Sequence, residues 1–138
     1  MRTTEFAVDT TDRFVTDITD RVEAFAGEAE SDGLLHVFVP HATAGVAVME
    51  TGSGSEPDLE ETVRRLLPRD DRYVHRHGPP GHGGDHLLPV FVSPSVVLPV
   101  RAGRPALGTW QRVVLVDPNR QNNERRVMLS FLEGTSGI

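Results

Sequence analysis

Three histidines in separate segments, His41, His75 and His86, are the side chains best able to do chemistry in this sequence. Neutral imidazoles from separated segments can converge on a zinc-like ion and leave a fourth coordination position open for water or substrate. Histidines serve equally well as hydrogen-bonded structural groups or as exposed switches. The spacing leaves both interpretations open, and we take these three residues as the candidate metal ligands.

The other histidines are assigned structural or incidental roles. His36 lies within an apolar run, which is typical of a hydrogen-bonded histidine in a core or at an interface. His77 and His82 lie in a loop rich in glycine and proline, residues 77–84. A histidine-rich tract of this kind can bind metal without any catalytic meaning.

Two polar residues outside the histidine set are the candidates for catalysis. Glu50 follows the apolar run 46–49, where its carboxylate could accept a proton or orient a ligand histidine. A solvated charge at a strand end is the alternative for Glu50. Gln111 ends the segment Gly108–Gln111, and its amide could contact a substrate or fix a histidine.

Substrate binding is assigned to residues that can donate hydrogen bonds or contact a ring. Arginine can hold a phosphate through two parallel hydrogen bonds, although arginines at strand ends are usually solvated or paired with acidic neighbours. A single tryptophan is most often an anchor in a core or an interface. The residues assigned to substrate binding are Thr43, Thr109, Trp110 and Arg126.

The composition excludes several classes of protein and site. The chain has 138 residues, which fits one domain, residues 1–138. It contains no cysteine, which excludes disulfides, thiolate metal sites and cysteine nucleophiles. The formal net charge of -6 works against binding to nucleic acid or to anionic membranes. Because neither a signal-peptide pattern nor an apolar run of membrane-spanning length occurs, we expect a soluble, cytoplasmic protein.

Hydrophobic periodicity predicts many strands and two helices. The helices are expected to start near Asp17 and Glu56, and residues 34–39 to form a central strand buried on both faces. Because few helices connect the strands, the pattern favours an α+β fold of packed, mostly antiparallel sheets with the two helices on one face. Strands are expected at residues 5–8, 13–15, 34–39, 45–49, 73–74, 87–92, 96–100, 112–116 and 126–132.

Several segments, taken in order and spacing, resemble the YjbQ-like family. The segments that carry the resemblance are His41–Glu50, Asp85–Leu87, Leu98–Gly103 and Gly108–Gln111. The match extends from about Thr3 to Gly134. The resemblance implies the YjbQ-like α+β fold, a weak activity of the thiamine-phosphate-synthase type and assembly as a homotrimer. It also implies that the corresponding histidines cluster and can hold a divalent metal, with zinc the first choice.

The chain departs from the family pattern at positions that concern phosphate binding. Leu88 stands where many relatives carry a lysine, and Asn123-Glu124 stands where relatives often have a glycine-proline-arginine turn. The sequence also lacks a Walker-type phosphate loop and an aspartate cluster for magnesium. The metal site is therefore better supported than phosphate binding.

The sequence thus predicts a metal-dependent enzyme that acts on a phosphorylated or heterocyclic small molecule through the three-histidine site. A metal there could stabilise the charge that develops on departing phosphate oxygens. The alternative is a noncatalytic trimer that binds a metal or an anionic metabolite. A third hypothesis is an assembly protein in which the same motifs build the trimer interface.

Overall fold

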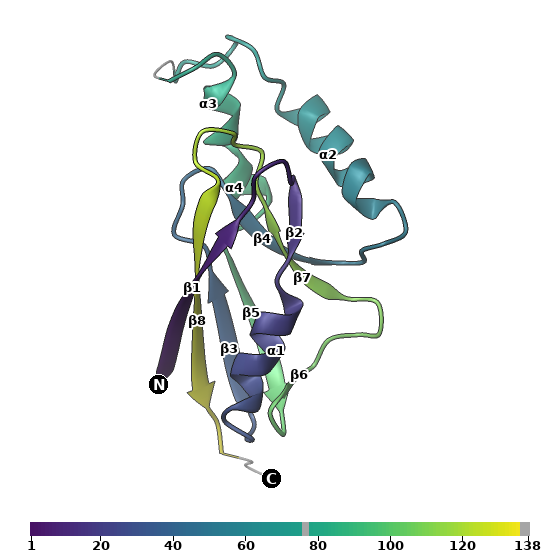
Figure 1. Cartoon of the computed structure of the whole chain (residues 1–138), viewed down its shortest axis with the longest axis vertical. Helices are drawn as coiled ribbons and strands as arrows, with labels where there is room; N and C mark the ends of the chain where they lie inside the picture. Colours follow the sequence, from purple (N-terminus) through teal and green to yellow (C-terminus); the bar gives the residue numbers. More distant parts are fainter. Residues whose placement is uncertain (76–77, 136–138) are drawn as a thin grey trace.

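Two antiparallel β-sheets form the framework of the computed structural model, which describes residues 1–75 and 78–135, so that His77 lies outside the described residues (Figure 1). A five-stranded sheet has the order β1-β8-β3-β5-β6, and a three-stranded sheet has the order β2-β7-β4. The predicted α+β class of packed antiparallel sheets is confirmed. The strands are β1 (Arg2–Asp9), β2 (Val15–Asp17), β3 (Gly33–Phe38), β4 (Gly45–Met49), β5 (Ser95–Arg101), β6 (Arg104–Pro105), β7 (Arg112–Val116) and β8 (Glu124–Glu133).

Two long and two short helices complete the described part of the chain. They are α1 (Thr19–Gly27), α2 (Ser55–Leu66), α3 (His82–Asp85) and α4 (Leu88–Phe91). The start of α1 is held by Asp17, whose Oδ1 accepts the backbone N–H of Thr19 at 2.9 Å. Among the helices of the described residues, none combines the length and the apolar character that crossing a membrane requires.

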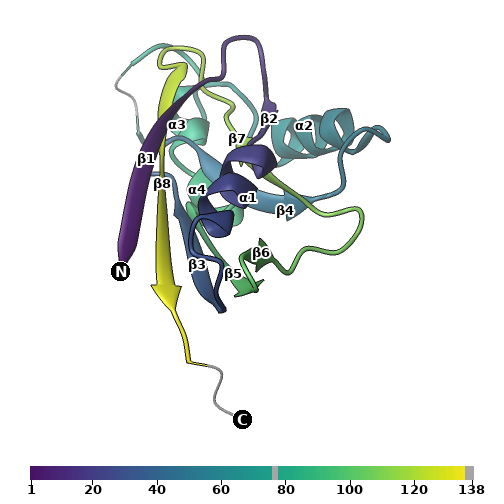
Figure 2. The same cartoon turned by 60° about the horizontal axis from the view of Figure 1, so that its bottom comes forward.

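Strand β7 lies between two hydrophobic cores. Val113 and Leu115 belong to the core formed by α1 and the inner face of the five-stranded sheet, whereas Val114 and Val116 belong to a second core with α2 and α4. All four side chains have 0% exposure, because successive residues of a strand point to opposite faces. Accordingly α2 lies on the side of the three-stranded sheet away from β1 and β8 (Figure 2).

Strand β3 is buried on one face only. Leu35 and Val37 are fully buried in the first core, but Leu34 on the opposite face is 47% exposed. The prediction that residues 34–39 form a strand buried on both faces is therefore wrong. Val97 and Leu132 are also exposed on this outer face of the five-stranded sheet. Residues 34–39 read as a continuous apolar run because the exposed outer face of the sheet also carries apolar side chains.

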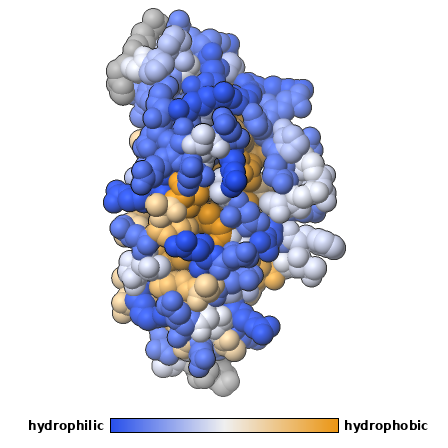
Figure 3. All heavy atoms as spheres, viewed as in Figure 1, coloured by the Kyte–Doolittle hydropathy of each residue, from blue (hydrophilic) through white to orange (hydrophobic). Residues whose placement is uncertain are grey.

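Two segments predicted as strands have other conformations. Residues 87–92 contain α4, whose first turn holds Pro89 and whose Leu88 has 0% exposure in the second core. Residues 73–74 form a bend. The prediction for residues 87–92 is wrong because a short apolar run does not distinguish a strand from one buried helical turn. The prediction for residues 73–74 is wrong because no strand of the two described sheets pairs with them, and Val74 is 95% exposed. The surface above these cores is mostly hydrophilic, and hydrophobic residues gather near the middle of the face shown in Figure 3.

The first and last strands of the chain pair along the whole length of β1. The register runs from Arg2 opposite Phe131 to Asp9 opposite Glu124. Beyond β1, the backbone N–H of Thr10 donates to the carbonyl of Asn123 at 2.8 Å. This pairing brings Thr10 next to the loop between β7 and β8, which carries the polar residues described next.

Candidate functional site

The rings of His75, His82 and His86 form one cluster at α3. The ring centroids of His75 and His86 are 4.3 Å apart, those of His82 and His86 4.5 Å, and those of His75 and His82 5.7 Å. The Nε2 atoms of His82 and His86 are 2.7 Å apart, a hydrogen bond in which one nitrogen carries the proton. The structure therefore brings together two of the three predicted metal ligands, His75 and His86, with His82 in third place.

Tight packing around Tyr73 positions this cluster. Residues His82–Asp85 form one helical turn and His86 follows directly, so that the two rings, four positions apart, lie on the same side of α3. A Cβ atom on Gly83 would lie 2.7 Å from Cβ of Tyr73, and one on Gly84 would lie 2.9 Å from its hydroxyl oxygen. The Tyr73 hydroxyl donates to the carbonyl of Pro68 at 2.7 Å, and burial raises the pKa of Tyr73. Glycine at both positions thus lets α3 lie against the segment that carries His75.

Asn119 links Asp85 to the histidine cluster through hydrogen bonds. Asn119 Oδ1 accepts the backbone N–H groups of Gln121 and Asn122 at 3.0 and 3.1 Å, which fixes the orientation of its amide. The amide nitrogen therefore faces Asp85 Oδ2 at 3.1 Å and His82 Nδ1 at 3.5 Å. Because a donor faces Nδ1, we assign the proton of neutral His82 to Nε2, from which it points at His86.

Asp85 is the buried charge nearest to the cluster. Its side chain is 4% exposed and forms an ion pair with Arg69, whose Nη1 lies 2.5 Å from Asp85 Oδ1. Arg69 also donates to the carbonyl of Pro118 at 3.3 Å. Through Arg69 the pair connects α3 to the start of the β7–β8 loop.

A second polar centre lies at the start of β8. Arg125 and Asp117 form a buried ion pair with side-chain exposures of 1% and 0%. Two hydrogen bonds of 2.7 Å join the guanidinium to the two carboxylate oxygens. Thr10 donates to the same carboxylate at 2.6 Å, and Arg125 donates to Thr43 Oγ1 at 2.8 Å. Thr43, assigned to substrate binding from the sequence, is thus a buried partner of Arg125.

His41 lies beside this second centre. Its Nε2 accepts the backbone N–H of Arg126 at 2.9 Å. Burial lowers the pKa of His41, and the nearby positive charges of Arg125 and Arg126 lower it further, against the opposing effect of Asp117. Neutral His41 therefore uses its Nε2 lone pair to accept a hydrogen bond from β8 and is not part of the cluster of His75, His82 and His86.

The remaining predicted site residues lie at the surface. Glu50 is exposed directly after β4, and the side chain of Arg126 is exposed on β8. Gln111 Oε1 accepts the backbone N–H of Gly108 at 2.7 Å and so closes the turn before β7. Thr109 is exposed in that turn, and Trp110 is 73% exposed. The β6–β7 loop that carries these residues projects from the body of the molecule (Figure 1).

Several polar residues of the site are not among the sequence candidates. They are His82, Asp85, Asn119, Arg69 and Arg125. The four-residue spacing of His82 and His86 is a helical spacing that could indicate a shared face, but the two intervening glycines disfavour a helix. Alternate side chains of a strand point to the same face, and those of Val127 and Leu129 on β8 point into the core. The same pattern could have identified Arg125 as a buried residue.

Within the part of the chain that the structure describes, no group of three or more histidine, aspartate or glutamate side chains is arranged to hold a metal ion. A pocket of about 240 Å³ adjoins the cluster and is lined by His75, His82, Tyr73 and the loop residues Gly78–Gly81. His75 and His82 therefore border a space that could admit a small ligand.

A family model described as "UPF0047 protein YjbQ-like" matches residues 4–134. The UPF0047 protein Rv2556c of Mycobacterium tuberculosis is 61% identical over 134 residues, which covers 97% of this chain and 100% of the relative.

Solved structures of similar proteins have the same fold. The hypothetical protein APE1520 of Aeropyrum pernix K1 superposes with a TM-score of 0.86 at 36% identity, covering 97% of this chain and 100% of that one. A YbjQ-like protein of unknown function, SSO2532 of Sulfolobus solfataricus P2, superposes with a TM-score of 0.88 at 26% identity, covering 96% and 97% of the two chains.

Proposed function

The chain belongs to the UPF0047 YjbQ-like family, and from this premise we propose that it is a metal-dependent enzyme acting on a phosphorylated or heterocyclic small molecule. The observation that carries the proposal is the cluster of His75, His82 and His86 beside a pocket. The weak thiamine-phosphate-synthase-type activity implied by the family resemblance is the first reaction to test.

Imidazole nitrogen is a ligand type that suits a divalent metal such as zinc, although the described side chains are not arranged around an ion. Structural chemistry of zinc favours imidazole nitrogen at about 2.0–2.1 Å in a tetrahedral arrangement, which places two ligand nitrogens about 3.3 Å apart. Nε2 of His82 and Nε2 of His86 are 2.7 Å apart, so a small rotation of either ring would open the space for an ion. His75, His82 and His86 would hold the metal. His82 would be the third ligand in place of His41, which the sequence prediction had named.

The residues around the cluster have separable roles in this proposal. A bound metal would act as a Lewis acid toward phosphate oxygens. For His82 to bind a metal through Nε2, its proton would have to move to Nδ1, and the Asn119 amide, which lies 3.5 Å from Nδ1, would have to shift. Asn119 and the pair of Asp85 with Arg69 hold α3 in place, which keeps His82 at the pocket.

Metal content and turnover of histidine variants test the proposal. Protein purified without a histidine tag is measured for bound metal and for thiamine phosphate formation, with His82→Ala, His86→Ala and the matched control His36→Ala. His36 is bonded to Ser95 at 2.7 Å on the outer sheet face. We expect the two cluster variants to lose metal and activity together, and the control to keep its bound metal.

Other outcomes separate the alternatives. Equal metal content in all variants would refute the metal site. Metal bound at the cluster without turnover on any phosphorylated substrate would favour the noncatalytic binding protein. Loss of metal in His41→Ala but not in His82→Ala would restore the ligand set derived from the sequence.

We further propose that copies of this chain assemble, as a homotrimer, through the outer face of the five-stranded sheet. Leu34 lies opposite Leu132 in the register of β3 and β8, and His36 lies opposite Val97 in that of β3 and β5. The exposed side chains of Leu34, Val97 and Leu132 thus form adjacent apolar surface, which marks contact sites in soluble proteins. Light scattering on Leu132→Glu tests this: an unchanged mass would exclude the face.

A further inference from the structure

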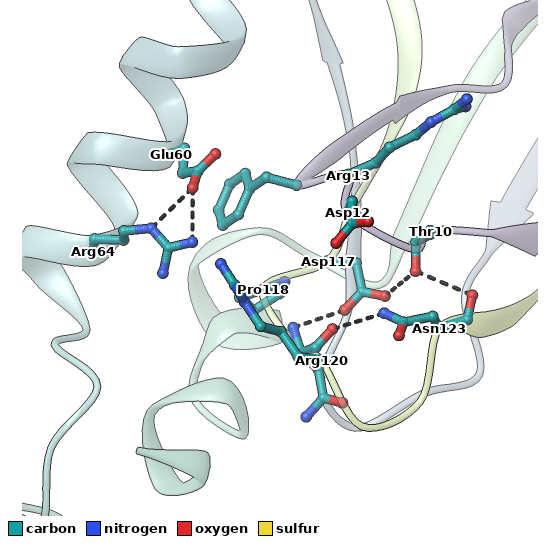
Figure 4. A pocket seen from close by; sticks show the side chains of 11 residues that line it. Thr10, Asp12, Arg13, Glu60, Arg64, Asp117, Pro118, Arg120 and Asn123 are labelled. Atoms are coloured by element: carbon teal, nitrogen blue, oxygen red, sulfur yellow. Dashed lines mark hydrogen bonds and ion pairs between the residues drawn. The ribbon is translucent and has the colours of Figure 1, made fainter. Parts of the chain in front are cut away.

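A second pocket, of about 210 Å³, lies on the other side of Asn119 from the histidine cluster. Thr10, Asp117 and Asn119 are buried residues that line it. The close-up in Figure 4 shows Glu60 and Arg64 of α2 on one wall and Thr10, Asp117 and Asn123 on the facing wall, with Arg13 turned away. The pocket is therefore built from three separate parts of the fold.

Three carboxylates and three arginines line this pocket, and two of the carboxylates already have partners. Glu60 is neutralised by Arg64, which donates to it at 2.7 and 2.9 Å, and Asp117 is neutralised by Arg125. Asp12 is the carboxylate that remains, whereas Arg13 and Arg120 form no ion pair with any described residue. Because Arg13 is turned away from the pocket, Arg120 is the lining arginine that remains available to an anion, with Asp12 as the opposing charge.

The floor of the pocket is fixed by hydrogen bonds. Asp117 Oδ1 accepts the backbone N–H of Asn119 at 2.9 Å, and Asn123 donates to the carbonyl of Asn119 at 3.2 Å. The loop that carries Arg120 is thus anchored on both sides of this residue. A guanidinium held on a rigid loop keeps more of its hydrogen-bond energy for an anion than one on a mobile segment.

We infer that this pocket binds the phosphate or diphosphate group of a small molecule, with Arg120 as its main partner. The inference rests on the proposed function for the class of substrate and adds the place where the anionic group binds. Asn119 contributes to both sites, because it lines the pocket while its amide nitrogen faces Asp85 and His82 at 3.1 and 3.5 Å. A molecule whose anionic group occupies the pocket would therefore lie one side chain away from the cluster.

Pyrophosphate is the probe for the test. Calorimetric titration uses protein freed of metal with a chelator and then desalted, because pyrophosphate itself binds metal ions. We expect Arg120→Ala to weaken binding about tenfold or more, as the loss of a charged hydrogen bond does. Asp12→Asn should strengthen binding about fivefold, because it removes a negative charge close to the anion. The control Arg104→Ala, an exposed arginine of β6, should leave the affinity unchanged.

The outcomes separate this inference from the proposed metal site. Pyrophosphate binding retained in metal-free His86→Ala would support a site in the pocket, even if the metal proposal itself fails. No pyrophosphate binding, or equal affinity in Arg120→Ala and Arg104→Ala, would overturn the inference. Loss of binding in His86→Ala but not in Arg120→Ala would place the anion at the histidines and would overturn it as well.

Discussion

Replacing Asp117 by asparagine should strongly destabilise the fold. The substitution keeps the size of the side chain but leaves the charge of Arg125, which is 1% exposed, without its counterion. Removing one partner of a buried ion pair typically costs about 3–5 kcal/mol, because the other charge remains away from water. Domains of this kind have an unfolding free energy of about 5–15 kcal/mol. The variant should therefore lose a large part of its stability.

Urea unfolding followed by circular dichroism measures this loss. The exposed counterpart is Asp17, which pairs with Arg112 at 2.7 Å with side-chain exposures of 34% and 37%. Asp17→Asn should cost at most about 1 kcal/mol, because solvent screens an exposed pair and asparagine can still bond to Thr19.

A double variant tests the cause of the effect. Arg125→Met combined with Asp117→Asn removes both charges, so it should be more stable than Asp117→Asn alone by at least about 1 kcal/mol. Additive losses from the two substitutions, or an Asp117→Asn variant within about 1 kcal/mol of the wild type, would refute the reasoning.

Three further predictions concern single residues. The lowered pKa of His41 means that its contribution to stability is fully present above its ordinary pKa of 6.5 and is lost as the pH falls through the lowered value. The urea midpoint should therefore fall less between pH 7.5 and pH 5 in His41→Gln than in the wild type. An equal fall in both proteins would contradict this. Gly84→Ala should destabilise by about 1–3 kcal/mol through overlap with Tyr73, and an unchanged thermal midpoint would refute it. Trp110→Ala should lower the unfolding free energy of each chain by less than about 1 kcal/mol, because this ring is 73% exposed. If the ring contacts another copy, the same substitution should lower the particle mass measured by light scattering. A large loss of stability at constant mass would count against that role.

Strands with alternating or β-branched apolar residues could be predicted from the sequence because the period of a strand is visible in them. Residues 45–49 and 112–116 coincide with β4 and β7. Of the apolar stripe that the sequence predicts for the second helix, Leu59, Val63 and Leu67 pack in the second core, whereas Leu66 is 53% exposed. Residues 87–92 fail because Leu88 is buried by contacts with α2 and β7, which the local pattern does not contain.

The candidate site was predicted in part. The gathering of His75 and His86 depends on a loop with no periodicity, so the sequence could name these residues but could not select His82 as their neighbour. The choice of Arg126 over Arg125 overlooked strand parity, which buries Arg125 and exposes Arg126. Asn119 gave no local signal, since its role arises from contacts with Asp85 and His82 far away in the chain.

The pairing of β1 with β8 has a consequence for synthesis of the protein. Residues 2–9 leave the ribosome long before residues 124–131, so the amino-terminal strand must wait, unpaired, until almost the whole chain has emerged. Contacts of such long sequence separation slow folding, and an unpaired strand can associate with other nascent chains in the meantime. Removing β1 would leave β8 with unpaired backbone groups along one edge, and removing β8 would do the same to β1. Both truncations should therefore be poorly tolerated.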